Sequence, residues 1–212
     1  MGITIYKATL LYPRRAWKQV EMEYAEKVSA GGIFLGTLEG YAHIENARRD
    51  EADGAVVIEP GYLTSELPDH VPHIERLRRY TGLSFGTIIG GEIQRQVQNA
   101  NAFCMSNSRD SYDGYPEKPS VWFEVTDVVG LAEVLATKLI DRIVHLEVRP
   151  VSYERRRFSA QETYPQPDMF IKDESLSAED EIRIGIICKP TVPHEPIDFK
   201  EDPDIAQFLR AS

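Results

Sequence analysis

The feature that most constrains the fold is a β-branched run close to the C-terminal end of the sequence. From Glu181 to Cys188 the chain reads EIRIGIIC, in which isoleucines flank one arginine and one glycine. Branched side chains pack well on a pleated sheet and lose freedom in a helix, so this run predicts a strand. The segment before it, DESLSAED, is acidic. We therefore expect a buried strand that is entered from a polar loop.

Two carboxylates, Glu179 and Glu181, stand where this strand begins. Residues two apart on an extended backbone face the same way, so both side chains would point into whatever lies above the strand end. The alternative is a solvated turn or strand entrance, in which Ser177 and Asp180 form a start similar to a capping box. Arg183 is either a cross-strand partner for a glutamate or an inward-facing ligand for an anion.

The N-terminal half of the chain alternates strand-like and helix-like segments. An apolar alternation over 3–12 predicts a first strand, and apolar residues at helical spacing over 16–28 predict a helix that two glycines stop. The segments IFLGTL and AVVIEPG predict two more strands, with a charged excursion between them. The stretch 83–106 predicts a hairpin with a double-glycine turn.

The C-terminal half adds strands in VWFEV and RIVHLEVRPVSY, and Asp127 predicts the cap of a helix over 128–141. The total of seven or eight strands and three or four helices, in mixed order, indicates an α+β fold with a largely antiparallel mixed sheet. A chain of 212 residues suits one main core. We expect a single domain over 1–189, followed by a proline-rich strap over 190–212 that finishes in a short helix near 203–210.

Composition narrows the function classes. With 34 acidic and 24 basic residues the formal net charge is -10, which argues against general nucleic-acid binding by the whole surface. Cys104 and Cys188 form no CxxC pair, so we expect reduced, buried thiols and a cytoplasmic protein. No stretch has the long apolar core of a signal peptide or a membrane span, so no membrane partner is expected.

Other polar clusters have two interpretations each. Arg155 to Arg157 could bind a phosphate or pair with surface carboxylates. His70 and His73 could share a helix face, but no third ligand stands at a convincing spacing, so no metal is expected. Cys104 as a nucleophile would need a nearby base, and packing in the core is the alternative.

Several short segments carry a resemblance. FLGTLEGY, DEADG, a strand ending in FCMS, WFEVTD, and FIK followed by EDEIRI are similar to an uncharacterised family of bacterial and phage domains. Those domains share a late lysine followed by E-x-E-x-R, and the likeness covers most of 3–189. The family implies no activity.

The order of a first strand and helix, a strand ending in serine, and E-x-E at a strand start also resembles ADP-ribosyltransferases, which hold NAD between two small sheets. Breaking the glycosidic bond of NAD develops positive charge on the ribose, and a carboxylate beneath it stabilises that transition state. The resemblance implies that Glu181 would stabilise the ribosyl cation, Glu179 would orient the acceptor and Ser106 would position the glutamate. It implies the following candidate ligands for the dinucleotide: Lys7, Arg14 and Arg183.

Two classes of function follow from the sequence. The first is an NAD-using ADP-ribosyltransferase-like or NAD glycohydrolase-like enzyme that takes a nucleotide or dinucleotide ligand. The second is a non-catalytic acidic binding protein, a phage–host conflict or regulatory factor, that acts on a basic protein partner. Convergence of Ser106, Glu181 and a basic residue on one cleft would favour the enzyme, and acids spread over a convex face would favour the binding protein.

Overall fold

The structure is a computed structural model that describes residues 4–5, 15–42, 53–59, 62–64, 87–89, 93–109, 118–159 and 162–212. Its main sheet has nine strands among these residues. The central path runs in the order β1 (Thr4–Ile5), β10 (Ile143–Pro150), β14 (Glu181–Cys188), β8 (Ala100–Ser106), β2 (Ala16–Glu21), β9 (Ser120–Val125) and β16 (Leu209–Ala211). Two further strands branch off this path and complete the sheet: β3 (Phe34–Thr37) pairs with β8, and β15 (Ile197–Asp198) pairs with β3. Only β1 pairs in parallel within this sheet, with β10.

The predicted strand at the C-terminal end is confirmed as β14, which lies between β10 and β8. Its alternation gives the sheet two different faces. One face carries Ile182, Ile184 and Ile186, all almost fully buried in the main apolar core. The opposite face carries Glu181 and Arg183, so β14 is apolar on one side and charged on the other.

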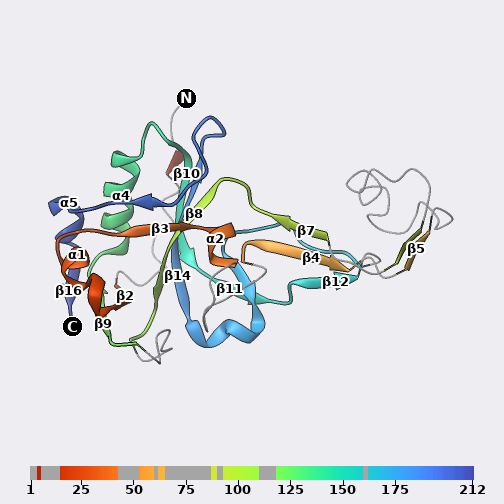
Figure 1. Ribbon diagram of the computed structural model, residues 1–212, viewed down its shortest axis with the longest axis horizontal. Coiled ribbons are helices and arrows are strands. Elements are labelled where there is room, and N and C mark those ends of the chain that lie inside the picture. Colours follow the sequence, from red (N-terminus) through yellow and green to blue (C-terminus); the bar gives the residue numbers. More distant parts are fainter. Residues whose placement is uncertain are drawn as a thin grey trace.

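Helix α4 (Val128–Lys138) covers the apolar face of the sheet (Figure 1). Asp127 caps it as predicted, because its carboxylate accepts a hydrogen bond from the backbone N–H of Gly130 at 3.0 Å. Leu131 and Leu135 point into the core. The short helix α5 (Pro203–Ala206) adds Ile205 to the same core.

Smaller sheets extend the molecule beyond the main sheet, toward the right of Figure 1. A three-stranded sheet consists of β12 (Arg157–Ser159), β4 (Ala55–Glu59) and β7 (Ile93–Gln96). Beyond it, β5 (Tyr62–Thr64) pairs with β6 (Thr87–Ile89). A parallel pair, β11 (Ser152–Glu154) and β13 (Ile171–Asp173), leads into the 3-10 helix η2 (Glu174–Glu179). The remaining short elements are η1 (Met22–Tyr24), α1 (Ala25–Ser29) and α2 (Leu38–Ala42).

The α+β fold with a mostly antiparallel sheet is therefore confirmed. The helix predicted over 16–28 is wrong over its first half, because residues 16–21 form β2 between β8 and β9. Of that stretch only Ala25–Ser29 is α-helical. The arms of the expected hairpin over 83–106 pair elsewhere, β6 with β5 and β7 with β4. The tail over 190–212 contributes β15 and β16 to the main sheet, and its helix ends at Ala206.

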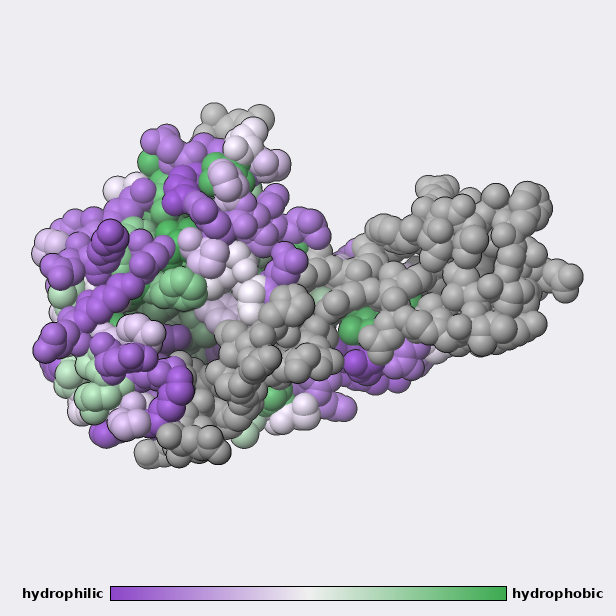
Figure 2. Space-filling model, in the orientation of Figure 1, coloured by the Kyte–Doolittle hydropathy of each residue, from purple (hydrophilic) through white to green (hydrophobic). Residues whose placement is uncertain are grey.

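The surface that Figure 2 shows is largely hydrophilic where residues are described, in keeping with the high charge of the sequence. No helix among the described residues is long and apolar enough to cross a membrane.

Candidate functional site on the charged face of the sheet

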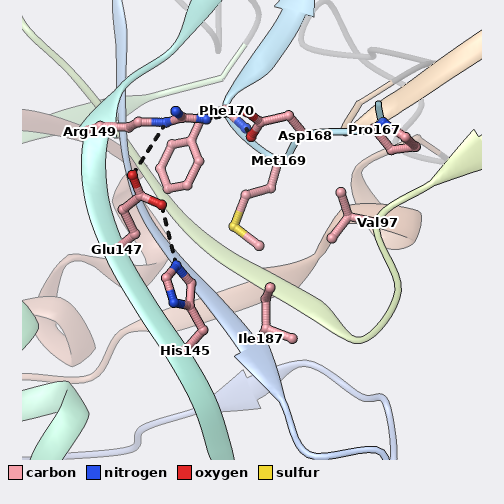
Figure 3. Close-up of a pocket in the computed structure, with 9 residues that line it drawn as sticks. All are labelled: Val97, His145, Glu147, Arg149, Pro167, Asp168, Met169, Phe170 and Ile187. Atoms are coloured by element: carbon pink, nitrogen blue, oxygen red, sulfur yellow. Dashed lines mark hydrogen bonds and ion pairs between the residues drawn. The ribbon is translucent and has the colours of Figure 1, made fainter. Parts of the chain in front are cut away.

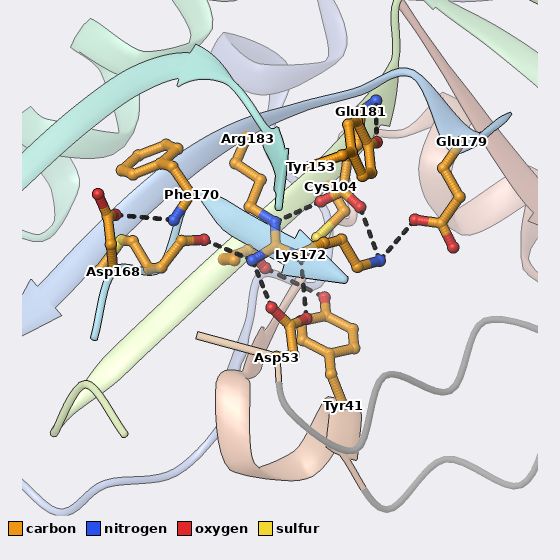
Figure 4. A network of polar contacts seen from close by, with 12 residues as sticks. Tyr41, Asp53, Cys104, Tyr153, Asp168, Phe170, Lys172, Glu179, Glu181 and Arg183 are labelled. Carbon is orange, nitrogen blue, oxygen red and sulfur yellow. Dashed lines mark hydrogen bonds and ion pairs between the residues drawn. The ribbon is translucent and has the colours of Figure 1, made fainter. Parts of the chain in front are cut away.

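Arg183 is the centre of a buried ionic network on the charged face of β14 (Figure 4). Its side chain is fully buried, and its guanidinium binds both carboxylate oxygens of Asp53 at 2.7 and 2.9 Å. It also donates to the Glu181 carboxylate and, at 2.5 Å, to the backbone carbonyl of Met169. One arginine therefore ties β14 to the start of β4 and to the segment before β13.

Lys172 extends the network to the second glutamate (Figure 4). Its ammonium lies 2.5 Å from Glu179 and 3.1 Å from Glu181. The three side chains are between 5% and 8% exposed, so their charges are removed from water. Buried charges of this kind are tolerated only where they are paired and hydrogen-bonded.

The two glutamates differ in proton affinity, because both contact Lys172 but only Glu181 also contacts Arg183. Burial raises the pKa of Glu179 to about 7, and the neighbouring Glu181 adds to this effect although Lys172 opposes it. Burial would also raise the pKa of Glu181, but Arg183 and Lys172 together hold that pKa below its ordinary value. When two carboxylates share one cation, the one with the extra cation stays ionised and the other takes the proton.

Ser106 faces the same region, because it is the register partner of Glu181 on the adjacent strand β8. Cys104 is the partner of Arg183, and burial raises the pKa of its thiol to about 12. The thiol is therefore protonated at neutral pH and is suited to packing rather than to nucleophilic attack. Tyr153 from β11 accepts a hydrogen bond from the backbone N–H of Glu181 at 2.8 Å.

The structure thus brings together four of the predicted site residues, Glu179, Glu181, Ser106 and Arg183, on one face of the sheet. The solvated-turn interpretation of the two glutamates is wrong, since both are 6% exposed, and the capping residue of η2 is Asp173. Neither interpretation of Arg183 describes its contacts fully: it binds carboxylates, but Glu181 lies on its own strand and the other carboxylate is that of Asp53, while its cross-strand partners are Arg149 and Cys104. Lys7 and Arg14 lie outside the described residues.

A pocket of about 220 Å³ lies beside this network (Figure 3). Alternate residues of β10 form one wall of the pocket. The Pro167–Phe170 segment, which precedes β13, forms another part of the lining. The residues that line the pocket are Val97, His145, Glu147, Arg149, Pro167, Asp168, Met169, Phe170 and Ile187.

The charged side chains of the pocket form a row (Figure 3). His145 Nε2 lies 3.3 Å from Glu147, and the other Glu147 oxygen lies 3.8 Å from Arg149 Nε. Arg149 also forms an ion pair with Asp168, and its guanidinium lies 4.3 Å from the centre of the Phe170 ring. These four charged or titratable side chains are between 28% and 35% exposed, in contrast to the sealed network nearby.

The network and the pocket share the segment that contains Met169 and Phe170. Arg183 binds the carbonyl of Met169, whose side chain lines the pocket. A methyl group added at Gly185 would lie 2.3 Å from Met169 Sδ and 2.7 Å from the Phe170 ring. The absence of a side chain at Gly185 therefore lets this segment lie flat on the sheet.

The pocket was not predicted from the sequence, although the β10 segment contains a pattern that indicates a polar strand face. In RIVHLEVRP, His145, Glu147 and Arg149 alternate with apolar residues, which is the pattern of a strand with one polar face. Lys172 and Asp53 were also missed as members of the network. Lys172 reaches the two glutamates from β13, on the other side of η2, and Asp53 lies 130 positions from Arg183 in the chain.

The remaining polar clusters have structural explanations or lie outside the described residues. Arg155 pairs with Glu162 at 2.8 Å and Arg157 with Glu59 at 3.3 Å, while Arg156 is buried and donates to the Ala55 carbonyl. The surface-carboxylate interpretation of the arginine run is confirmed for its two outer members. Residues 70 and 73 are not among those described. In the described part of the chain, no group of three His, Cys, Asp or Glu side chains is placed to hold a metal ion.

No protein-family model, curated protein or solved structure matches this chain. The resemblances to bacterial and phage domains and to ADP-ribosyltransferases therefore stay predictions.

Proposed function

We propose that this protein is a non-catalytic binding protein whose ligand occupies the pocket between β10 and the Pro167–Phe170 segment. The observation that supports this is the convergence of partly exposed polar side chains over an apolar floor. Small-molecule sites are concave and mostly apolar, with a few polar groups that fix orientation. Five of the nine residues that line this pocket are apolar, among them Val97, Met169 and Ile187, so its lining is more polar than is usual and offers several groups that can fix orientation.

The buried network supports the pocket rather than forming the ligand site. Glu181 is in contact with two cations and Glu179 with one, and little of either side chain reaches the surface. A ligand at Glu181 would have to displace Lys172 or Arg183 and leave a buried charge without its partner, which is costly. Ligand binding at the pocket requires no such exchange.

Methyl-labelled NMR tests the proposal without knowledge of the natural ligand. The methyl groups of Met169 and Ile187 lie in the pocket, whereas those of Ile184 and Leu131 lie in the core on the other face of the sheet. A fragment set that contains cations, anions and neutral aromatics should include members that shift the Met169 and Ile187 signals but leave Ile184 and Leu131 unchanged. If no fragment shifts the pocket methyls, the pocket is not a ligand site and the proposal fails.

The second candidate is the NAD-using enzyme, which the register of Ser106 and Glu181 on adjacent strands favours. Its cofactor would be NAD, with Glu181 beneath the ribose. Calorimetry with NAD and ADP-ribose, with nicotinamide release followed in parallel, tests it on wild type and on Glu181→Gln. Binding and turnover that the variant loses, in protein that circular dichroism shows to be folded, would favour the enzyme. Absence of heat with either ligand would remove it. A cytoplasmic location is proposed with both candidates.

A further inference from the structure

We infer that the pocket binds a small organic cation, an ammonium or guanidinium group on a short apolar stem, and that Glu147 is its anchor. The inference rests on the proposed function and names the chemical class of its ligand.

Carboxylates outnumber guanidinium groups in the pocket. Glu147 and Asp168 supply two negative charges and Arg149 supplies one positive charge, so these three side chains leave one negative charge in excess. Because these side chains are about two-thirds buried, that charge is screened less than a surface charge would be and attracts a single cation.

The two carboxylates of the pocket, Asp168 and Glu147, differ in the hydrogen bonds that they already accept. One oxygen of Asp168 accepts from the backbone N–H of Phe170 at 2.9 Å, and the other accepts from Arg149. Both oxygens of Asp168 therefore already accept a hydrogen bond within the protein, and this side chain stabilises the Pro167–Phe170 segment.

Glu147 is less engaged. Its nearest partner is His145 Nε2 at 3.3 Å, and Arg149 Nε is 3.8 Å away, beyond hydrogen-bond distance. Arg149 Nε itself makes no hydrogen bond within the described part of the chain. An ionised carboxylate has about four acceptor sites, so Glu147 retains capacity for a ligand donor.

Apolar side chains complete the pocket. Ile187 lies beside His145 on the neighbouring strand β14, and Met169 and Val97 lie farther from β10 (Figure 3). The volume of about 220 Å³ corresponds to about seven water molecules at roughly 30 Å³ each. That space fits a cationic head at Glu147 and a short aliphatic stem on Met169 and Ile187. The apolar contact supplies affinity in proportion to the area removed from water.

An anionic ligand fits the same pocket poorly. The cation available to it is Arg149, which is held by Asp168 and stacked on Phe170. An anion would have to draw Arg149 away from Asp168 while lying close to Glu147, and like charges at such distances repel.

Four probes whose alkyl stems have three carbons (butyrate) or four carbons (n-butylammonium, n-butylguanidinium and 1-butanol) test the ligand class by NMR. We expect the two cations to shift the methyl signals of Met169 and Ile187. Glu147→Gln should weaken their binding at least tenfold, and Glu147→Asp, which keeps the charge, should weaken it less. Glu201→Gln is the matched control, since Glu201 is an exposed glutamate outside the pocket.

The outcomes separate this inference from the proposed function. If butyrate or butanol binds as well as the cations, or if Glu147→Gln binds the cations like wild type, the ligand class is wrong although the pocket is a site. If neither these probes nor any fragment shifts the pocket methyls, the proposed function fails as well.

The cation could belong to a free amine or to a side chain of a basic protein. Acetyl-lysine-amide and acetyl-arginine-amide, in which the amino and carboxyl groups are blocked, distinguish these sources. Tighter binding of the blocked residues than of the bare amines would assign a protein side chain. Weaker binding would assign a free amine, and the loss of binding in Glu147→Gln is expected with either.

Discussion

Arg183 and Asp53 form a fully buried, two-point ion pair between residues 130 positions apart in the chain. The pair connects the central strand β14 to the residues that enter β4. Because the same guanidinium holds the carbonyl of Met169, the pair also supports one side of the pocket. The charged face of the sheet is thus organised by long-range contacts to one residue.

Removal of the charge of Asp53 should be strongly destabilising. In Asp53→Asn, Arg183 stays buried but loses a carboxylate that accepts two hydrogen bonds, and breaking a buried pair in this way costs about 3–5 kcal/mol of unfolding free energy. Urea denaturation, monitored by circular dichroism, measures this loss of unfolding free energy. The control is Glu21→Gln, which breaks the surface pair with Lys118 and should cost far less, because water screens an exposed pair. Equal losses in both variants would contradict the role given to Asp53.

The pH dependence of stability should contain a contribution from Glu179. Burial raises its pKa from 4.5 to about 7, so between these pH values the folded protein binds more protons than the unfolded chain. This contribution to stability is complete below pH 4.5 and is lost as the pH rises through 7. Wild type should therefore lose about 1–3 kcal/mol relative to Glu179→Gln between pH 5 and pH 8.

Denaturation of both proteins across this pH range measures the difference. Glu181 acts in the opposite direction, because its pKa is lowered. Its contribution is present above pH 4.5 and is lost as the pH falls below that value, outside the range compared. Parallel stability curves for wild type and Glu179→Gln would show that Glu179 does not hold a proton in the folded protein.

Gly185→Ala should alter the pocket by displacing Met169 and Phe170, which lie over Gly185 and line the pocket. The added methyl group would overlap Met169 Sδ and the Phe170 ring, which must then move away from the sheet. Overpacking of this kind costs about 1–3 kcal/mol. We expect the variant to be folded, less stable, and at least tenfold weaker toward n-butylguanidinium. Unchanged binding by NMR titration would show that the position of this segment does not set the shape of the pocket.

Asp127→Ala should destabilise the protein through helix α4 alone. The Asp127 side chain satisfies the N–H of Gly130, and loss of such a cap costs about 0.5–2 kcal/mol. Asp127→Ser should restore most of the stability, since serine is also a good capping residue. Thermal unfolding of the three proteins is the measurement, and ligand binding at the pocket should be unaffected in all of them.

Local sequence signals predicted the parts of the fold that depend on local chemistry. The β-branched run predicted β14, and Asp127 before an apolar helical pattern predicted α4. The pattern at 16–21 misled because AWKQVE fits a helix as well as a strand. Pairing with β8 and β9 decides in favour of the strand, which buries Ala16, Gln19 and Val20.

The site was predicted in part for the same reason. Period-two spacing predicted that Glu179 and Glu181 point into one region. Lys172 does bind both, but Glu179 is the last residue of η2 and not part of the extended strand; Ser106 lies opposite Glu181. Whether these carboxylates are open to a ligand depends on Lys172 and Asp53, which reach them from other segments. The pocket depends on the approach of the Pro167–Phe170 segment to β10, which no local pattern encodes.

A crystal structure of the protein soaked with n-butylguanidinium tests the central claim most directly. The account predicts the guanidinium within about 2.7–3.2 Å of the Glu147 carboxylate, with the butyl stem on Met169 and Ile187. Asp168 should keep its contacts with Arg149 and Phe170. A pocket without ligand, or a guanidinium bound only to carboxylates elsewhere on the acidic surface, would contradict it.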